Sequence, residues 1–165
     1  MIGMVLLVAV GIGVGKLLSV PNDPVEASTG AENNNLVERE ADHIVQIAAK
    51  LKKMHESPGG YSGLTAERAI AFHAVPPVMV KNSSTLVSSW GGVELGPAST
   101  TGIERFGLVY QAVPSPACIQ LVLKLRTAGW TALTVNGNVV GENPPMGGIE
   151  AACASDSNTI VFVGG

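Results

Sequence analysis

The sequence predicts an α+β fold in which a long N-terminal helix packs on a domain with a mainly antiparallel β-sheet. Two observations support this fold class. The first part of the chain is helical in pattern, with an apolar run over residues 1–20 and an amphipathic stretch over residues 36–54. The second part instead has short β-branched or aromatic runs bounded by Gly, Pro and Asn. Helices that precede the strands, rather than alternating with them, are typical of α+β folds.

The N-terminal run, Met1–Val20, has the length of a membrane-spanning helix. It would be about 30 Å long, the thickness of the hydrocarbon core of a bilayer, and its first ionisable side chain is Lys16. The alternative is a cleaved signal peptide, which needs a basic region before the apolar run and a small-x-small cleavage site after it. Nothing basic precedes the run and its end is a poor cleavage site. These features favour a retained helix that breaks at Pro21.

The run contains four glycines, namely Gly3, Gly11, Gly13 and Gly15. Each glycine destabilises a helix in water by about 1 kcal/mol relative to Ala, so their number indicates tight helix packing or local melting. Gly11 and Gly15 form a G-x-x-x-G pair, which lets two helices approach closely in lipid. We therefore expect these glycines to pack against other helices.

Residues 21–35 are predicted to form a linker or melted stretch, because they begin with two prolines and are rich in Gly, Ser and Asn. A second helix is expected over residues 36–54, with Asn35 as its N-cap and Glu38 completing a capping box. Apolar residues repeat in this helix at a spacing of three to four, which predicts that it lies on a core. They are Val37, Ala41, Ile44, Ala48 and Leu51, with Val45, Ile47 and Met54 beside them.

Residues 36–165 are predicted to form one globular α+β domain that begins with this helix. A short helix is expected over Ala66–Ala74 with Thr65 as its cap, and another after the cap residue Ser115, stopping by Gly129. Strands are expected over four further runs. These runs are residues 85–90, 106–113, 131–135 and 159–163.

The chain has two cysteines, Cys118 and Cys153, and no C-x-x-C pair. Thioredoxin-type redox and zinc-ribbon functions are therefore disfavoured. A membrane segment implies an oxidising exterior, in which a single disulfide is the natural interpretation. On the chain-entropy model, closing that loop would stabilise the folded state by about 4 kcal/mol. Two buried free thiols are the alternative.

Composition and motifs disfavour an enzyme and a nucleic-acid-binding protein. The formal net charge is −3 and no basic cluster occurs. Glu40 and His43 have the spacing of half a di-metal motif, but the other half is missing, and a solvated helix face is the better interpretation. No G-x-S-x-G motif occurs. We expect no catalytic residue, metal or cofactor.

Two tryptophans could stack on a sugar, although a role as core anchors is the commoner one. They are Trp90 and Trp130. The chain also has few charged residues, 14% against the usual quarter. Such a composition suits a protein that hides much of its surface in an assembly.

Several segments, by their order and spacing, resemble the type IVb pilins, in particular the subunits of plasmid-encoded conjugative thin pili. The segments are Gly59-Gly60-Tyr61, Ser89-Trp90-Gly91-Gly92, Val113-Pro114-Ser115-Pro116-Ala117-Cys118, Gly129-Trp130, and Cys153 followed by Asp156-Ser157-Asn158-Thr159-Ile160-Val161-Phe162. The likeness covers most of the chain. It implies the type IV pilin fold, with the N-terminal helix interrupted near Pro21.

The resemblance implies a structural subunit that polymerises into a pilus for conjugation, mating-pair contact or adhesion. A prepilin peptidase would leave Met1 as a methylated N-terminus. Met1–Val20 would anchor the subunit in the inner membrane, facing the periplasm, and then form the core of an extracellular filament. The implied partners are other copies in a helical homopolymer, the inner-membrane assembly machinery and a recipient or host cell surface. Val5 stands where the family has Glu, which leaves the mechanism of subunit docking open.

Two other classes of protein would have the same sequence features. A pseudopilin or minor pilin of a secretion system would have the same anchor but form a short piston or a tip. A membrane-tethered sugar-binding module would stay monomeric and bind a glycan near Trp90 or Trp130.

Overall fold

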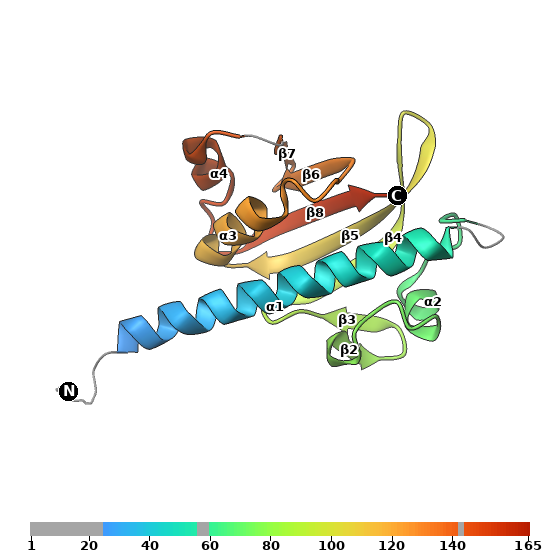
Figure 1. Ribbon diagram of the computed structural model, residues 1–165, viewed down its shortest axis with the longest axis horizontal. Coiled ribbons are helices and arrows are strands. Elements are labelled where there is room, and N and C mark those ends of the chain that lie inside the picture. Colours follow the sequence, from blue (N-terminus) through green and yellow to red (C-terminus); the bar gives the residue numbers. More distant parts are fainter. Residues whose placement is uncertain (1–24, 56–59, 142–143) are drawn as a thin grey trace. The chain divides into compact units, whose positions relative to one another are not determined.

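The computed structural model describes residues 25–55, 60–141 and 144–165. The chain divides into two compact units, Met1–Leu36 and Val37–Gly165. In the first unit the structure describes only the beginning of helix α1. The second unit holds the sheet and the remaining helices (Figure 1).

The elements follow in this order: α1 (Val25–Met54), α2 (Ala66–Ala71), the 3-10 helix η3 (Pro77–Met79), β2 (Val80–Asn82), β3 (Thr85–Val87), β4 (Gly92–Thr100) and β5 (Ile103–Val113). After β5 come α3 (Ser115–Leu125), β6 (Ala132–Val135), β7 (Asn138–Val139), α4 (Met146–Ala152) and β8 (Asn158–Gly164). The described part of the chain is therefore helical first and mixed afterwards, as predicted.

The seven strands that the structure describes pair antiparallel in one sheet of order β2-β3-β4-β5-β8-β6-β7. The last strand of the chain, β8, lies between β5 and β6. In the centre of the sheet Leu108 pairs with Leu95 on one side and with Phe162 on the other. The segment from α3 to α4 is thus held at both ends by central strands.

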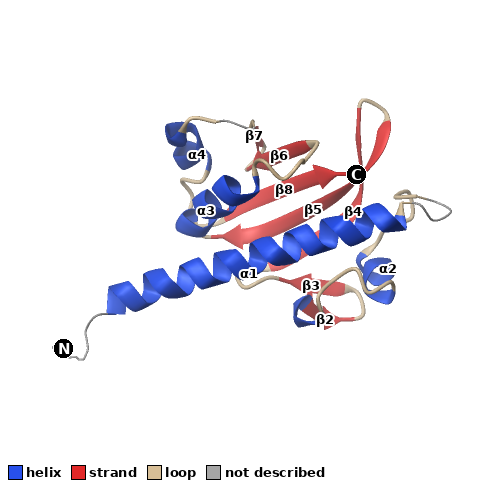
Figure 2. Cartoon of the chain, viewed as in Figure 1, coloured by secondary structure: helices blue, strands red, loops and turns tan. Residues whose placement is uncertain are grey.

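Helices α1 and α3 lie on the same face of the sheet (Figure 2). Alternate residues of β5, including Phe106, Leu108 and Tyr110, are fully buried beneath them. The stripe predicted on the second helix is confirmed, because its five principal residues and Ile47 are all buried. Val45 is 49% exposed, so the stripe is narrower than predicted.

Helix α1 begins at Val25, eleven residues before the predicted start at Leu36. The expected linker is therefore wrong for residues 25–35, and Asn35 lies inside the helix instead of capping it. This segment contains the good helix formers Glu26, Ala27, Ala31 and Glu32. Adding turns to an existing helix also needs no new nucleation, so weak formers such as Asn are tolerated.

The shorter helices are close to their predicted places. Thr65 caps α2 as predicted, since its Oγ1 accepts from the Arg68 backbone N–H at 3.1 Å, but the helix ends at Ala71 and not at Ala74. Ser115 is the first residue of α3 instead of its cap, and Pro114 takes the cap position without a side-chain hydrogen bond. Pro116 stands in the first turn, where its missing N–H has no cost.

The four predicted strands are all present, although the first ends at Val87 and not at Trp90. Strand β4 was not predicted, because its sequence GVELGPAST does not alternate and contains Pro97. Beyond Val93, β5 is the only described strand that pairs with this one. One side of Pro97 is therefore a free edge, where a missing N–H breaks no ladder bond.

Candidate functional site

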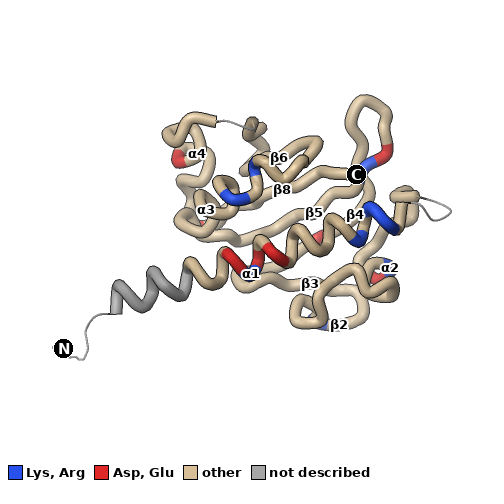
Figure 3. Tube along the Cα trace, viewed as in Figure 1, with Lys and Arg blue, Asp and Glu red and all other residues tan. Residues whose placement is uncertain are grey.

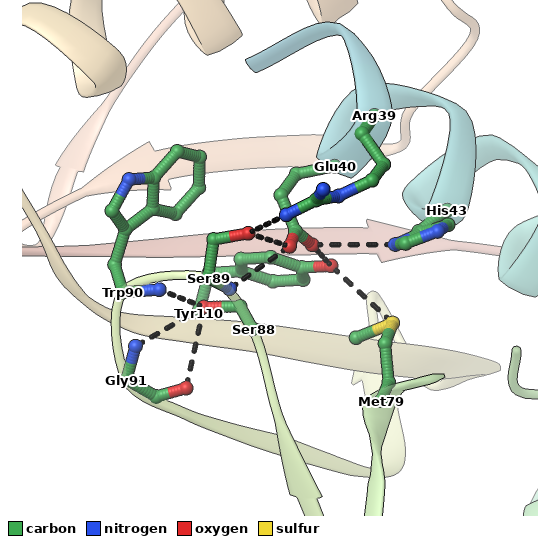
Figure 4. A network of polar contacts seen from close by, with 9 residues as sticks. All are labelled: Arg39, Glu40, His43, Met79, Ser88, Ser89, Trp90, Gly91 and Tyr110. Atoms are coloured by element: carbon green, nitrogen blue, oxygen red, sulfur yellow. Dashed lines mark hydrogen bonds and ion pairs between the residues drawn. The ribbon is translucent and has the colours of Figure 1, made fainter. Parts of the chain in front are cut away.

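Glu40 is a buried carboxylate on the sheet-facing side of α1, only 2% exposed. Its Oε2 accepts hydrogen bonds from the backbone N–H and the Oγ of Ser89, at 2.9 and 2.6 Å. Its Oε1 accepts from the Tyr110 hydroxyl at 3.0 Å (Figure 4). Three donors compensate for burying the carboxylate. The predicted solvated helix face is wrong at this residue.

Two basic side chains border this carboxylate. Arg39 donates from Nη2 to the Ser89 Oγ at 2.8 Å, so Ser89 relays between the guanidinium and Glu40 (Figure 4). The Nδ1 of His43 lies 3.5 Å from the Glu40 Oε1, but it makes no hydrogen bond within the described residues. The arrangement holds the carboxylate charge in place on α1.

Tyr110 supplies the donor from the sheet. Burial, followed by the charge of Glu40 and the hydrogen bond to it, raises the pKa of the Tyr110 hydroxyl far above its usual range. The hydroxyl therefore keeps its proton and remains a donor to Glu40 at any physiological pH. Strand β5 and helix α1 are joined through this bond, together with the Ser89 loop.

The Ser89 loop has a tight internal structure. The Ser88 Oγ accepts from the backbone N–H groups of Trp90 and Gly91, at 3.1 and 3.2 Å. A Cβ on Gly91 would come within 2.8 Å of the Ala112 Cβ, so no side chain fits there without movement. The Ser89-Trp90-Gly91-Gly92 motif is thus the loop that docks on Glu40. We call Glu40, Ser89 and Tyr110 the carboxylate clamp.

Cys118 and Cys153 form a disulfide with a Cα–Cα distance of 5.7 Å, and both are fully buried. The bond ties the first turns of α3 to the residue that follows α4. Beside it, the buried Asn158 donates to the carbonyls of Val113 and Ser155, at 2.9 and 2.7 Å. The disulfide prediction is confirmed, and the two-thiol alternative is excluded.

The two tryptophans pack in the core, which is the role that the sequence favoured over sugar binding. Trp130 packs against Phe106 and Phe162, with ring centroids 6.4 and 5.0 Å apart. Trp90 is partly buried against the same core. Within the described residues, no group of three His, Cys, Asp or Glu side chains could hold a metal ion.

The N-terminal residues of interest lie outside the described residues. They are Met1, Gly3, Gly11, Gly13, Gly15 and Pro21. Among the helices that the structure describes, none is both long and apolar enough to cross a membrane.

Comparison with known proteins decides the family. A family model described as PilS N terminal matches residues 34–164, which includes the carboxylate clamp and the disulfide. The chain belongs to the PilS family. The NMR structure of the type IVb pilin PilS from Salmonella typhi has a similar fold, with a TM-score of 0.50 at 23% identity, covering 77% of this chain and 94% of that one. Among curated proteins, none matches.

This PilS-family chain is a type IVb pilin subunit, a structural protein and not an enzyme. The resemblance to type IVb pilins inferred from the sequence is confirmed. The carboxylate clamp was missed by sequence reasoning, because the donors to Glu40 are 49 and 70 residues away along the chain. One signal was available: Glu40 directly precedes Ala41 at the edge of the apolar stripe of α1, where a charged side chain is out of pattern.

Proposed function

We propose that this PilS-family subunit is the major component of a type IVb pilus that reaches a recipient or host cell surface. Residues 1–20 anchor the subunit in the inner membrane, with the globular domain on the periplasmic side. They then pack with those of other copies in the centre of an extracellular helical filament. The apolar length of this segment and the family of the chain both support this assignment.

Within this proposal, prepilin peptidase and the inner-membrane assembly machinery are the processing and assembly partners. Met1 is the methylated N-terminus, and Gly11 and Gly15 allow close approach of neighbouring helices. The break at Pro21 and the glycines permit local adjustment when the segment leaves the lipid. Gly11→Leu should therefore lower the yield of filaments.

The observation that carries the proposal is the fastening of α1 to the sheet within a chain of the PilS family. A filament built on N-terminal helices transmits force from α1 to the outer domain. The apolar stripe and the carboxylate clamp join α1 to the sheet, while the disulfide closes the segment that follows β5. These bonds suit a subunit that bears load outside the cell.

The first experiment is to shear the surface of expressing cells and view the released fraction by negative-stain electron microscopy. Long thin filaments made mainly of this chain are the expected result. A chain that stays in the inner membrane, without filaments despite an intact assembly machine, would instead identify a pseudopilin or minor pilin.

Conjugation is separated from adhesion by a second experiment. Deleting the gene in a donor should lower transfer in liquid mating far more than transfer on a solid surface, because only liquid mating depends on a filament to bring cells together. If the deletion instead abolishes attachment to host cells and leaves both kinds of mating unchanged, the pilus serves adhesion.

A further inference from the structure

A hollow of about 300 Å³ lies beside the end of α1. It is lined by Lys50, Lys53, Met54, Phe72 and His73, which we call the basic pocket. Phe72 is 55% exposed, an unusual position for a large aromatic side chain. The amine of Lys50 donates to the His73 carbonyl at 3.1 Å and is held at the rim. Apolar walls with amines at the rim fit the stem and carboxylate of an acidic side chain.

The charges of α1 are unevenly distributed along its length. Its acidic residues, with Arg39 among them, lie before three lysines near its end (Figure 3). The Glu38 Oε1 lies 3.8 Å from the Lys124 Nζ, so this acidic residue already has a partner within the chain. Asp42 and Lys53 are both exposed, and neither forms an ion pair within the described residues. As far as the described residues go, each is therefore available to pair with another molecule.

Asp42 and Lys53 cannot pair with each other in one chain. They are eleven residues apart, which is about 16 Å along a helix and close to three full turns. The two charges thus lie on the same side of α1, well beyond the reach of a salt bridge. A contact between them requires two copies of the chain.

We propose that Asp42 of one subunit docks on the basic pocket of a second subunit, where it pairs with Lys53. The charges are complementary, and the two contact regions differ. Such a contact is heterologous, so each subunit keeps one region free for the next copy and the chain of contacts stays open. The inference rests on the proposed function, because it names a contact between subunits of that filament.

The test uses charge reversal in the full chain, expressed with its assembly machinery. Asp42→Lys and Lys53→Glu each place like charges together and should reduce the sheared filament fraction about tenfold or more. The double variant D42K/K53E restores opposite charges between neighbours and should recover most of the wild-type yield. Rescue of this kind is not expected from two independent losses of stability.

Lys52→Glu is the matched control. Lys52 is exposed and adjacent in sequence, but it does not line the basic pocket. Its reversal should leave the filament yield within about twofold of wild type, as expected of an exposed charge that forms no ion pair with the described residues. Formation of the Cys118–Cys153 disulfide, read from mobility on non-reducing gels, reports whether each variant folds.

The outcomes separate this inference from the proposed function. If the wild type makes no filaments, both fail. If the wild type makes filaments and both single reversals do so equally well, only this contact is wrong. Folded single variants without rescue in the double variant also overturn the Asp42–Lys53 pairing. If Lys53→Glu keeps the filaments but loses attachment to cells, the basic pocket takes an acidic group of the cell surface and not a second subunit.

Discussion

The carboxylate clamp and the disulfide-closed segment hold the same sheet in different ways. The clamp joins α1 to β5 and the Ser89 loop through hydrogen bonds to one buried charge. The disulfide closes a segment of 35 residues with a covalent bond. A buried charge depends on every donor around it, because an unpaired group in the interior is costly. A disulfide acts chiefly by restricting the unfolded chain. The clamp should therefore be sensitive to small local changes, and the disulfide only to its removal.

The largest loss is expected when the disulfide is removed. Cys118→Ala combined with Cys153→Ala should lower the free energy of unfolding by about 4 kcal/mol, the chain-entropy value for a loop of this length. Urea unfolding of the full chain in detergent measures the change. A loss below about 1 kcal/mol would show that the segment is held by Asn158 and β8 alone.

The second largest loss of stability is expected when the carboxylate of the clamp is removed. Glu40→Ala leaves the buried Tyr110 hydroxyl without its carboxylate acceptor and removes both hydrogen bonds from the exposed Ser89. It should lower the free energy of unfolding by about 3 kcal/mol. Glu40→Gln keeps an acceptor oxygen and should cost clearly less. The same urea series tests both, and equal stability of Glu40→Ala and wild type would mean that the clamp does not fasten α1.

The Ser89 loop offers a steric test of the clamp that leaves its polar groups unchanged. Gly91→Ala places a Cβ 2.8 Å from that of Ala112 and should cost about 2 kcal/mol through displacement of the loop. Gly141→Ala is a matched control, since no atom within 4 Å would meet its Cβ. A Gly91→Ala variant as stable as this control would contradict the tight fit of the loop.

Tyr110→Phe should have a smaller effect at neutral pH, about 1 kcal/mol, because Glu40 retains both Ser89 donors. The larger change is in alkali. The folded-state pKa of Tyr110 is raised above the ordinary value of 10.0, so its stabilising effect is complete below pH 10 and is lost as pH rises above it. The loss is about 1.4 kcal/mol per pH unit.

The Tyr110→Phe variant should lose stability less steeply above pH 10 than the wild type. Tyr61 remains in both proteins, and burial also raises its pKa, so some dependence on pH persists. Unfolding midpoints on either side of pH 10 measure the difference. Identical slopes in the two proteins would contradict the account of the buried hydroxyl.

The smallest change in stability is expected at the exposed ion pair of Glu38 and Lys124, in which the Lys124 Nζ lies 3.8 Å from the Glu38 Oε1. Lys124→Ala should change stability by about 0.5 kcal/mol or less, because water screens exposed ion pairs. A loss comparable to that of Glu40→Ala would mean that α3 depends on this pair for its contact with α1.

Local signals were sufficient for some parts of the fold. The apolar stripe of α1 could be predicted because the helical period is a local property of the sequence. The hairpin between β6 and β7 was also predictable, since Asn136-Gly137 is a strong signal for a two-residue turn and both residues have positive φ. It was missed only because β7 is two residues long.

Other features have no signal in the local sequence pattern of the strand concerned. Strand β4 has no alternating pattern, and its pairing with β5 over Val93–Thr100 exists because the Thr101-Gly102 turn brings the two strands together. The insertion of β8 between β5 and β6 likewise has no local signal.

The sequence alone was enough to predict the family, the helix-then-strand order and the disulfide, since two cysteines downstream of an apolar segment of membrane-spanning length favour a single pairing. The burial of Glu40 was decided by the tertiary structure. A carboxylate at the edge of a stripe faces water or the core depending on whether donors meet it there. Ser89 and Tyr110 reach it only after β5 and the Ser89 loop have packed against α1.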